Sequence, residues 1–341
     1  PGRIDSPISR EGAFLANNLL FAAFALVVLL GTVFPLIAEA YDGRQISVGE
    51  PYFDSMTRPV GVVLLFLMAV APALPWRAAG GEVLHRRLII PAWVAAAAML
   101  ASAAVGLRGL APLGAVGLGA FALGGISRSF VVGFRARRSA TGESRPRALM
   151  GMVAGNSRLY GGLIVHVGVV VFALAFTFSS AFSSEREVVL RAGQSATVRG
   201  YRVTYLDDRS TASARKTTVS VDLRVARAGR TLGVYAPALS TFASSRQAIG
   251  TPSVRTGLRE DLYLTLGAAP DKGRVVVGVR VNPMVVWLWI GAGVMVAGTA
   301  VAAWPTGGRR HRRSPASRPL SADVHDTPFD ELVGAAPGIE P

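Results

Sequence analysis

Long apolar runs separated by short polar segments fill the first 181 residues, and one further run follows residue 283. A helix needs roughly 18 or more apolar residues to cross a bilayer, and most of these runs reach that length. The pattern therefore predicts six membrane spans, of which the fourth is short and glycine-rich: Phe14–Ile37, Pro59–Trp76, Leu88–Gly106, Leu110–Ile126, Leu159–Ala181 and Met284–Trp304.

Between residues 185 and 282 the apolar positions recur with a period of two instead. Tyr201, Val203 and Tyr205 alternate with polar residues, and Val275 to Val281 form another such face. The alternation indicates half-buried β-strands, and Ala228-Gly229 between two runs predicts a hairpin turn. The predicted fold class is an α-helical polytopic membrane protein with an all-β domain, residues 182–283, inserted before the last helix.

The formal net charge is +15 and 51% of the residues are hydrophobic, with a mean hydropathy of +0.41. The arginines concentrate in alternate loops, which argues against nucleic-acid binding and for a topology signal with the lipid bilayer as partner. The positive-inside rule places both termini in the cytoplasm and the β-domain outside. The basic loops contain Arg3, Arg10, Arg77, Arg86, Arg87, Arg128, Arg135, Arg137, Arg138, Arg145, Arg147, Arg158 and Arg309 to Arg318.

Two polar segments complete the division into domains. Within the first domain, 1–181, residues 128–158 are arginine-rich and carry Gly142, Ser144 and Pro146, which disfavour a packed core. This composition predicts a solvated basic inner loop. After the last span, residues 284–304, the tail 305–341 is rich in Pro, Ser, Ala and Asp and lacks apolar periodicity. The tail is therefore predicted to be disordered.

The main candidate for chemistry is His166, which lies inside the apolar span Leu159–Ala181. An imidazole in hydrocarbon is costly, so it marks a functional site unless a neighbouring helix satisfies it by a hydrogen bond. The other histidines, His85, His311 and His325, lie in a basic loop or in the tail. Because the chain has no cysteine and no cluster with zinc-ligand spacing, His166 stands alone.

Two glycines lie near this imidazole on the predicted helix. Gly162 is one turn earlier on the same face as His166, and Gly168 lies just beyond it. Missing side chains at both positions predict an open slot beside the ring. Such a slot suits close helix packing, and it equally suits a flat macrocycle, because neutral imidazole is a common axial ligand of haem iron. Spacing alone does not decide between the two.

Several motifs in order along the chain resemble the C-terminal half of the CcmF family, the membrane core of the bacterial cytochrome c haem lyase. Within the transmembrane part, Val165-His-Val-Gly168 is similar to the family's intramembrane histidine motif. The resemblance runs from about residue 9 to 304. It includes Ser9–Leu20, Val27–Leu36, Ile46–Phe53, Glu185-Arg186, Arg259–Gly267, Asn282-Pro283 and Trp287–Trp289.

The resemblance implies that His166 is an axial ligand of a haem b in a bacterial inner membrane, with the second ligand contributed by a histidine absent from this chain. It implies a role in covalent attachment of haem to apocytochrome c. The partners implied are the missing N-terminal half, a CcmE-like haem chaperone and a CcmH-like thiol-presenting subunit. The family's tryptophan-rich haem-handling motif is also absent, and the chain begins with Pro1. We therefore expect part of a longer protein that is inactive on its own.

Two other interpretations stay open at this stage. A permease for a small solute would predict inverted repeats and broken helices, and no repeat is evident. A membrane-tethered β-domain that only docks partners would leave His166 with a structural role. The motif containing Arg259, Asp261 and Tyr263 is either a partner surface or a device that joins the β-domain to the membrane.

Overall fold

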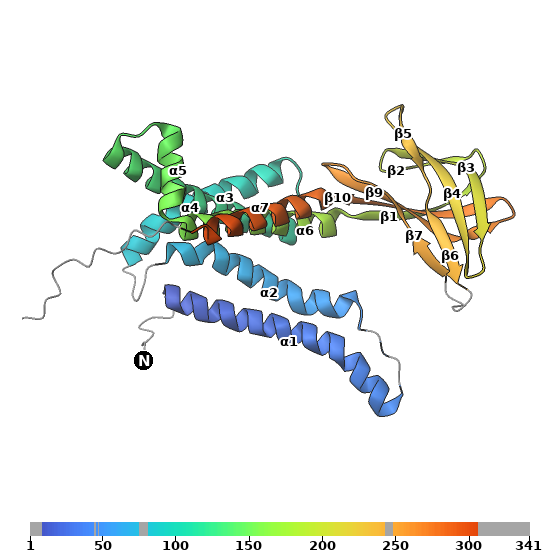
Figure 1. Cartoon of the computed structure of the whole chain (residues 1–341), viewed down its shortest axis with the longest axis horizontal. Coiled ribbons are helices and arrows are strands. Elements are labelled where there is room, and N and C mark those ends of the chain that lie inside the picture. Colours follow the sequence, from blue (N-terminus) through green and yellow to red (C-terminus); the bar gives the residue numbers. More distant parts are fainter. Residues whose placement is uncertain (1–8, 44–45, 47, 75–80, 243–247, 306–341) are drawn as a thin grey trace, which may run out of the picture. The chain divides into compact units, whose positions relative to one another are not determined.

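The computed structural model describes residues 9–43, 46, 48–74, 81–242 and 248–305 (Figure 1). Six of its helices are long and apolar enough to cross a membrane, as predicted, and only η1 and α5 among the described helices are not. The helices are α1 (Arg10–Asp42), α2 (Glu50–Val70), the 3₁₀ helix η1 (Ala71–Ala73), α3 (Gly81–Ala104), α4 (Leu110–Thr141), α5 (Arg145–Gly155), α6 (Ser157–Phe182) and α7 (Val285–Ala303).

The helices α1 and α2 show how local sequence sets their ends. The Ser9 side chain accepts a 3.1 Å hydrogen bond from the Gly12 N–H, and Gly43 ends α1 in the left-handed conformation at φ 70°. The second helix begins at Glu50, nine residues before the predicted span, because Pro51 suits the first turn of a helix. It ends at Val70 and η1 follows, whereas the predicted end of the span, Trp76, lies outside the described residues.

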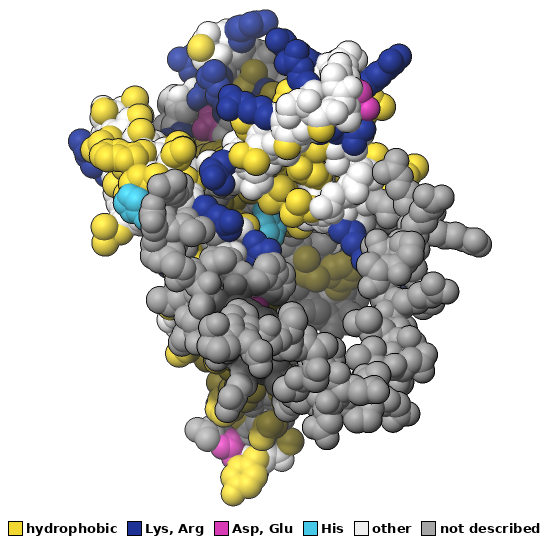
Figure 2. Space-filling model, turned by 90° about the vertical axis from the view of Figure 1, so that its left-hand side faces the viewer, with side chains coloured by type: hydrophobic (Ala, Val, Ile, Leu, Met, Phe, Trp, Pro, Cys, Tyr) yellow, Lys and Arg dark blue, Asp and Glu magenta, His cyan; other side chains and the backbone are white. Residues whose placement is uncertain are grey.

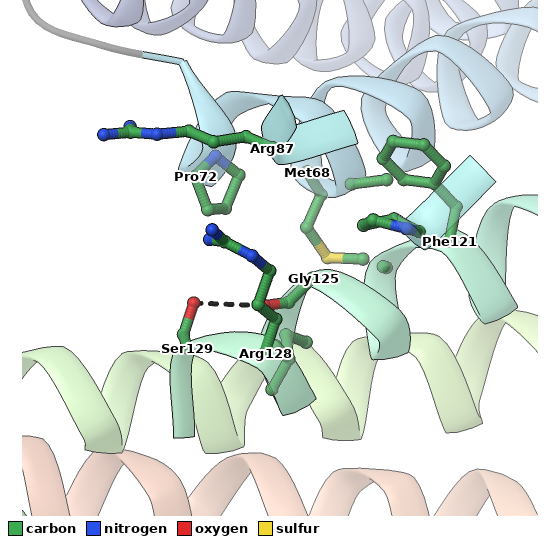
Figure 3. Close-up of a pocket in the computed structure, with 11 residues that line it drawn as sticks. Met68, Pro72, Arg87, Phe121, Gly125, Arg128 and Ser129 are labelled. Carbon is green, nitrogen blue, oxygen red and sulfur yellow. Dashed lines mark hydrogen bonds between the residues drawn. The ribbon is translucent and has the colours of Figure 1, made fainter. Parts of the chain in front are cut away.

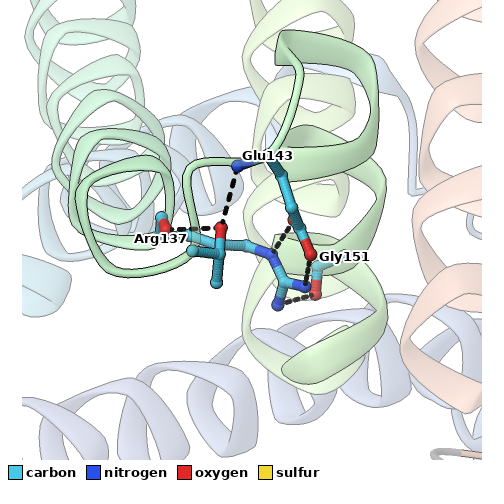
Figure 4. Close-up of polar contacts among 4 residues, drawn as sticks. Arg137, Glu143 and Gly151 are labelled. Carbon is cyan, nitrogen blue, oxygen red and sulfur yellow. Dashed lines mark hydrogen bonds and ion pairs between the residues drawn. The ribbon is translucent and has the colours of Figure 1, made fainter.

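The arginine-rich segment 128–158, predicted as a solvated basic inner loop, is mostly helical. Arginine is a good helix former, so α4 continues through this charged stretch until Gly142, whose φ of 64° ends it. At the bend, Arg137 donates two hydrogen bonds to the Glu143 carboxylate, at 3.0 and 3.1 Å, and one of 2.9 Å to the Gly151 carbonyl (Figure 4). This contact fixes α5 against the end of α4.

The arginines of this segment form a basic face. Figure 2 shows the end of the molecule that lies at the left of Figure 1, where Lys and Arg side chains gather beside few acidic ones. The exposed members on α4, α5 and the start of α6 are Arg128, Arg135, Arg138, Arg145, Arg147 and Arg158. The predicted disordered tail, 305–341, lies outside the described residues except for Pro305.

The β-domain consists of two antiparallel sheets. One sheet has the strand order β1-β10-β9-β8, and the other has β2-β3-β4-β6-β7 with β5 paired to β4. The strands are β1 (Ser184–Arg191), β2 (Ser195–Val198), β3 (Tyr201–Ala212), β4 (Lys216–Arg227), β5 (Arg230–Tyr235), β6 (Ala238–Phe242), β7 (Ala248–Thr251), β8 (Ser253–Arg255), β9 (Glu260–Asp271) and β10 (Arg274–Pro283).

The inward faces of both sheets share one apolar core, so the domain is a β-sandwich. Val203, Val225, Leu264 and Val277 are fully buried in it, and burying each such side chain contributes about 1.5–3 kcal/mol. The predicted period of two is confirmed in β3, β4 and β10. The predicted turn is confirmed as well, because Ala228 and Gly229 both have positive φ between β4 and β5.

Two connections join the sandwich directly to the last two helices. Only Ser183 separates α6 from β1, and only Met284 separates β10 from α7. Strands β1 and β10 pair along their whole length, from Ser184 with Val281 to Arg191 with Arg274. The Ser183 hydroxyl also donates a 2.7 Å hydrogen bond to Asn282 Oδ1 across this pair. The helix pair α6–α7 therefore continues into the strand pair β1–β10, with a single residue at each of the two junctions.

Candidate functional site

His166 lies in the middle of α6, and its ring has no hydrogen-bond partner among the described residues. Its Nδ1 atom is buried, whereas the residue as a whole is half-buried. An imidazole nitrogen that is removed from water without a partner costs about 1–3 kcal/mol. The described part of the chain therefore leaves this polar group unsatisfied.

The space beside the ring differs between the two glycines named with it. A Cβ atom built on Gly162 would meet no atom within 4 Å, so this position is open. A Cβ atom on Gly168 would lie 2.6 Å from Met295 Cγ and 2.7 Å from the Gly291 carbonyl oxygen of α7. Of the two uses predicted for the slot, close helix packing is the one found at Gly168, because α7 fills that side.

Gly162 and Gly168 face different sides of α6 because of the helical rotation between them. Two residues beyond His166, Gly168 is rotated by about 200° around the axis and faces the opposite side. There it forms part of a close contact between α6 and α7, in which Gly161 faces Ala302 and Gly298 faces Val165. Gly162, one turn before His166, stays on the side of the imidazole.

The contact of α6 with α4 lies on a third side of the helix. Leu163 and Tyr160 pack with Ile126 of α4 and Met152 of α5, and Val170 packs with Ala122 of α4 and Ala69 of α2. With α4 on one side of α6 and α7 on another, His166 is half-buried. The imidazole is thus held on a helix that two neighbours fix in place.

The motif Arg259-Asp261-Tyr263 joins the sandwich to the start of α7. The Arg259 carbonyl accepts a 2.9 Å hydrogen bond from the Met284 N–H, and the neighbouring Leu258 carbonyl accepts one of 2.9 Å from Trp287 Nε1. Asp261 is 3% exposed and accepts a 3.0 Å hydrogen bond from the Gly257 N–H. Tyr263 pairs with Arg280 across β9 and β10. These contacts favour the structural role of the motif over the partner surface.

Glu260, which lies between Arg259 and Asp261, belongs to a polar network that the sequence did not predict. Its carboxylate lies 2.5 Å from Arg227 Nη1 and accepts a 3.1 Å hydrogen bond from the Tyr201 hydroxyl. The Arg227 guanidinium also lies over the Tyr201 ring, 4.5 Å from its centroid. Burial, together with the Glu260 charge, raises the pKa of Tyr201. The network connects β3 and β4 of one sheet with β9 of the other.

No group of three or more His, Cys, Asp or Glu side chains comes together as a metal site within the described residues. His85 is exposed at the start of α3, and the histidines of the tail lie outside the described residues. What the site offers chemically is one imidazole beside an open glycine within an apolar span.

Three comparisons with known proteins agree on the family. Residues 181–283 match the family model CcmF_C, described as the CcmF C-terminal beta-sandwich. The cytochrome c-type biogenesis protein CcmF of Pseudomonas fluorescens is 28% identical over 287 residues, 83% of this chain and 42% of the relative. The cytochrome c-type biogenesis protein CycK of Bradyrhizobium diazoefficiens is 30% identical over 305 residues, 87% of this chain and 44% of the relative.

A solved structure of the cytochrome c haem lyase CcmF superimposes with a TM-score of 0.68 at 29% identity, covering 88% of this chain and 46% of the other. The chain spans less than half the length of the relatives that it matches. The family model places the sandwich at their C-terminal end. In sequence and in fold, the chain therefore matches the C-terminal part of the CcmF family of cytochrome c-type biogenesis proteins.

Proposed function

We propose that this chain is the C-terminal part of a bacterial inner-membrane cytochrome c haem lyase and that His166 is an axial ligand of a haem b within the membrane. The observation that carries the proposal is the unsatisfied His166 Nδ1 on an apolar helix. An imidazole in that position loses stability unless its nitrogens find partners. Iron on one nitrogen and a hydrogen-bond acceptor on the other would satisfy both.

The surroundings of His166 fit one half of such a site. Gly162 leaves room beside the ring, while α4 and α7 hold the helix from two other sides. When bound, haem b supplies an iron centre that can pass an electron to incoming haem. The residues of this chain would bind one face of the iron and orient the ring. A second axial histidine would come from the part of the relatives that this chain does not match.

The covalent step would need further proteins. Haem vinyl groups react with cysteine thiols of apocytochrome c, and this chain contains no cysteine. A CcmE-like haem chaperone and a CcmH-like thiol-presenting subunit are the partners we propose, with the sandwich on the outer side of the membrane. The chain alone is expected to lack ligation activity, because one axial ligand does not complete a site.

The test is to co-express this chain with the N-terminal half of a CcmF relative and to measure haem by pyridine haemochrome and visible spectra. The His166→Ala variant should lose the six-coordinate low-spin spectrum and about tenfold or more of its haem. The His166→Met variant should retain some haem with a shifted spectrum, because methionine can also ligate the iron. His85→Ala, an exposed histidine, is the matched control. Wild-type haem content and spectrum in His166→Ala would refute the proposed role of His166.

A further inference from the structure

A cavity of about 160 Å³ lies between α2, α3 and α4, away from the residues assigned above. One part of its wall is apolar and includes Met68, Phe121 and Ile126, and another part includes Arg87 and Arg128. The whole lining contains no acidic residue. The cavity therefore combines a hydrocarbon-like wall with a positively charged one.

The arginines are arranged around one side of this cavity (Figure 3). Arg128 extends from α4 toward Pro72, and the structure gives it no hydrogen-bond or ion-pair partner among the described residues. Pro72 is itself in contact with a third arginine, because Arg10 Nη2 donates a 2.8 Å hydrogen bond to its carbonyl oxygen. The Ser129 hydroxyl donates to the Gly125 carbonyl at 3.0 Å, so recognition of an anion would depend on the arginines.

The cavity lies where the apolar part of the bundle gives way to charge. The long apolar stretch of α4 ends at Ile126, and Arg128 is the first of its arginines. Helix α2 ends at Val70, Pro72 follows it in η1, and Arg87 lies near the start of α3. Helices α3 and α4 thus change from apolar to basic near the end of α2, which is the level at which lipid headgroups meet a membrane protein.

We propose that this cavity binds the phosphate of an anionic phospholipid. A guanidinium pairs with phosphate oxygens in a forked geometry, and basic pockets between transmembrane helices bind acidic headgroups. The volume of about 160 Å³ is well above the roughly 10–15 Å³ that a single water needs, so the cavity has room for a phosphate. The apolar wall favours a lipid over free phosphate, because it would accept the first carbons of an acyl chain.

The test uses the full chain purified in detergent and native mass spectrometry. Phosphatidylglycerol, phosphatidylcholine and inorganic phosphate are added in separate titrations. We expect bound phosphatidylglycerol in preference to the other two, and about fivefold weaker binding of it by Arg128→Gln, as expected for the loss of about 1 kcal/mol from one cation. Arg135→Gln is the matched control, since it removes the same charge from the exposed part of α4 beyond the cavity.

A second variant separates binding from folding. Gly125 lines the cavity, and a Cβ atom built on it would meet nothing within 4 Å. Gly125→Leu should therefore fill the cavity with every charge retained, and it should weaken phosphatidylglycerol binding as Arg128→Gln does. Equal loss in Arg135→Gln, or unchanged binding in Gly125→Leu, would overturn the proposed site. Binding of inorganic phosphate alone would overturn the lipid as its ligand.

Discussion

The Tyr205 hydroxyl is buried in the sandwich and donates a 2.5 Å hydrogen bond to Asp208 Oδ1. Burial raises the pKa of Tyr205 to about 12, and the hydrogen bond to Asp208 is the second largest cause of this shift. The ordinary value of tyrosine is about 10. The folded chain therefore keeps this proton at a pH at which the unfolded chain releases it.

A stability loss at alkaline pH follows. The contribution of Tyr205 is complete below pH 10 or so and is lost as the pH rises through about 12, the folded pKa. Tyr205 contributes at most about 2–3 kcal/mol to the free energy of unfolding in this way. We expect urea unfolding, followed by circular dichroism, to show a steeper decline above pH 10 in the wild type than in Tyr205→Phe. Parallel declines in the two proteins would contradict this assignment.

The role of a residue could be predicted from the sequence where its neighbours belong to the same helix, and could not where they belong to a distant one. An isolated histidine in an apolar run is visible in sequence, and Gly162 follows from helical spacing. The role of Gly168 was not predictable from α6 alone, because its neighbours come from α7, more than a hundred residues later. A signal existed nevertheless, since Gly161 and Gly168 are seven residues apart, as are Gly291 and Gly298. Equal spacing of small residues on two spans suggests that their backbones approach closely.

At the scale of elements, the α6–α7 pair depends on these glycines. A Cβ atom at Gly298 would lie 2.7 Å from the Val165 backbone nitrogen and 2.9 Å from the Gly161 carbonyl oxygen. The backbone cannot move aside as a side chain can, so Gly298→Ala must push the helices apart. We expect a loss of about 1–3 kcal/mol in detergent-based unfolding.

Gly293→Ala on the same helix is the matched control, because a Cβ atom there meets nothing within 4 Å. That variant should be neutral or slightly more stable, since alanine is the better helix former. Similar destabilisation by both variants would indicate that helix packing at Gly298 is not the cause. Unchanged stability in Gly298→Ala would exclude the close contact altogether.

Strands were easier to predict than helix ends. A period of two needs only one buried face, and β3, β4 and β10 bury alternate residues in a single core. Helix ends were harder to predict, because they depend on capping residues and on glycines in the left-handed conformation, which hydropathy does not reveal. Charge does not stop a helix, so α4 runs through its arginines until Gly142 provides the left-handed turn. The Arg137–Glu143 contact that fixes α5 required the fold to be known.

At the scale of the whole molecule, six spans and the distribution of arginine give the proposed topology. An even number of crossings returns both ends of the chain to one side. By the positive-inside rule, we propose that the exposed arginines of α4, α5 and the start of α6 face the cytoplasm. The sandwich, which lies between α6 and α7 in the chain, is then on the opposite side.

The absence of cysteine makes this arrangement directly testable by single substitutions. Ser210→Cys places a thiol on exposed β3, and Ser139→Cys places one on the exposed end of α4. In spheroplasts, a membrane-impermeant maleimide should label Ser210→Cys and spare Ser139→Cys until the membrane is opened with detergent. Both substitutions replace an exposed serine by a residue of similar size, so neither should disturb folding. The reverse labelling pattern would place the sandwich in the cytoplasm, where it could not meet apocytochrome c, and the proposed haem lyase topology would fail.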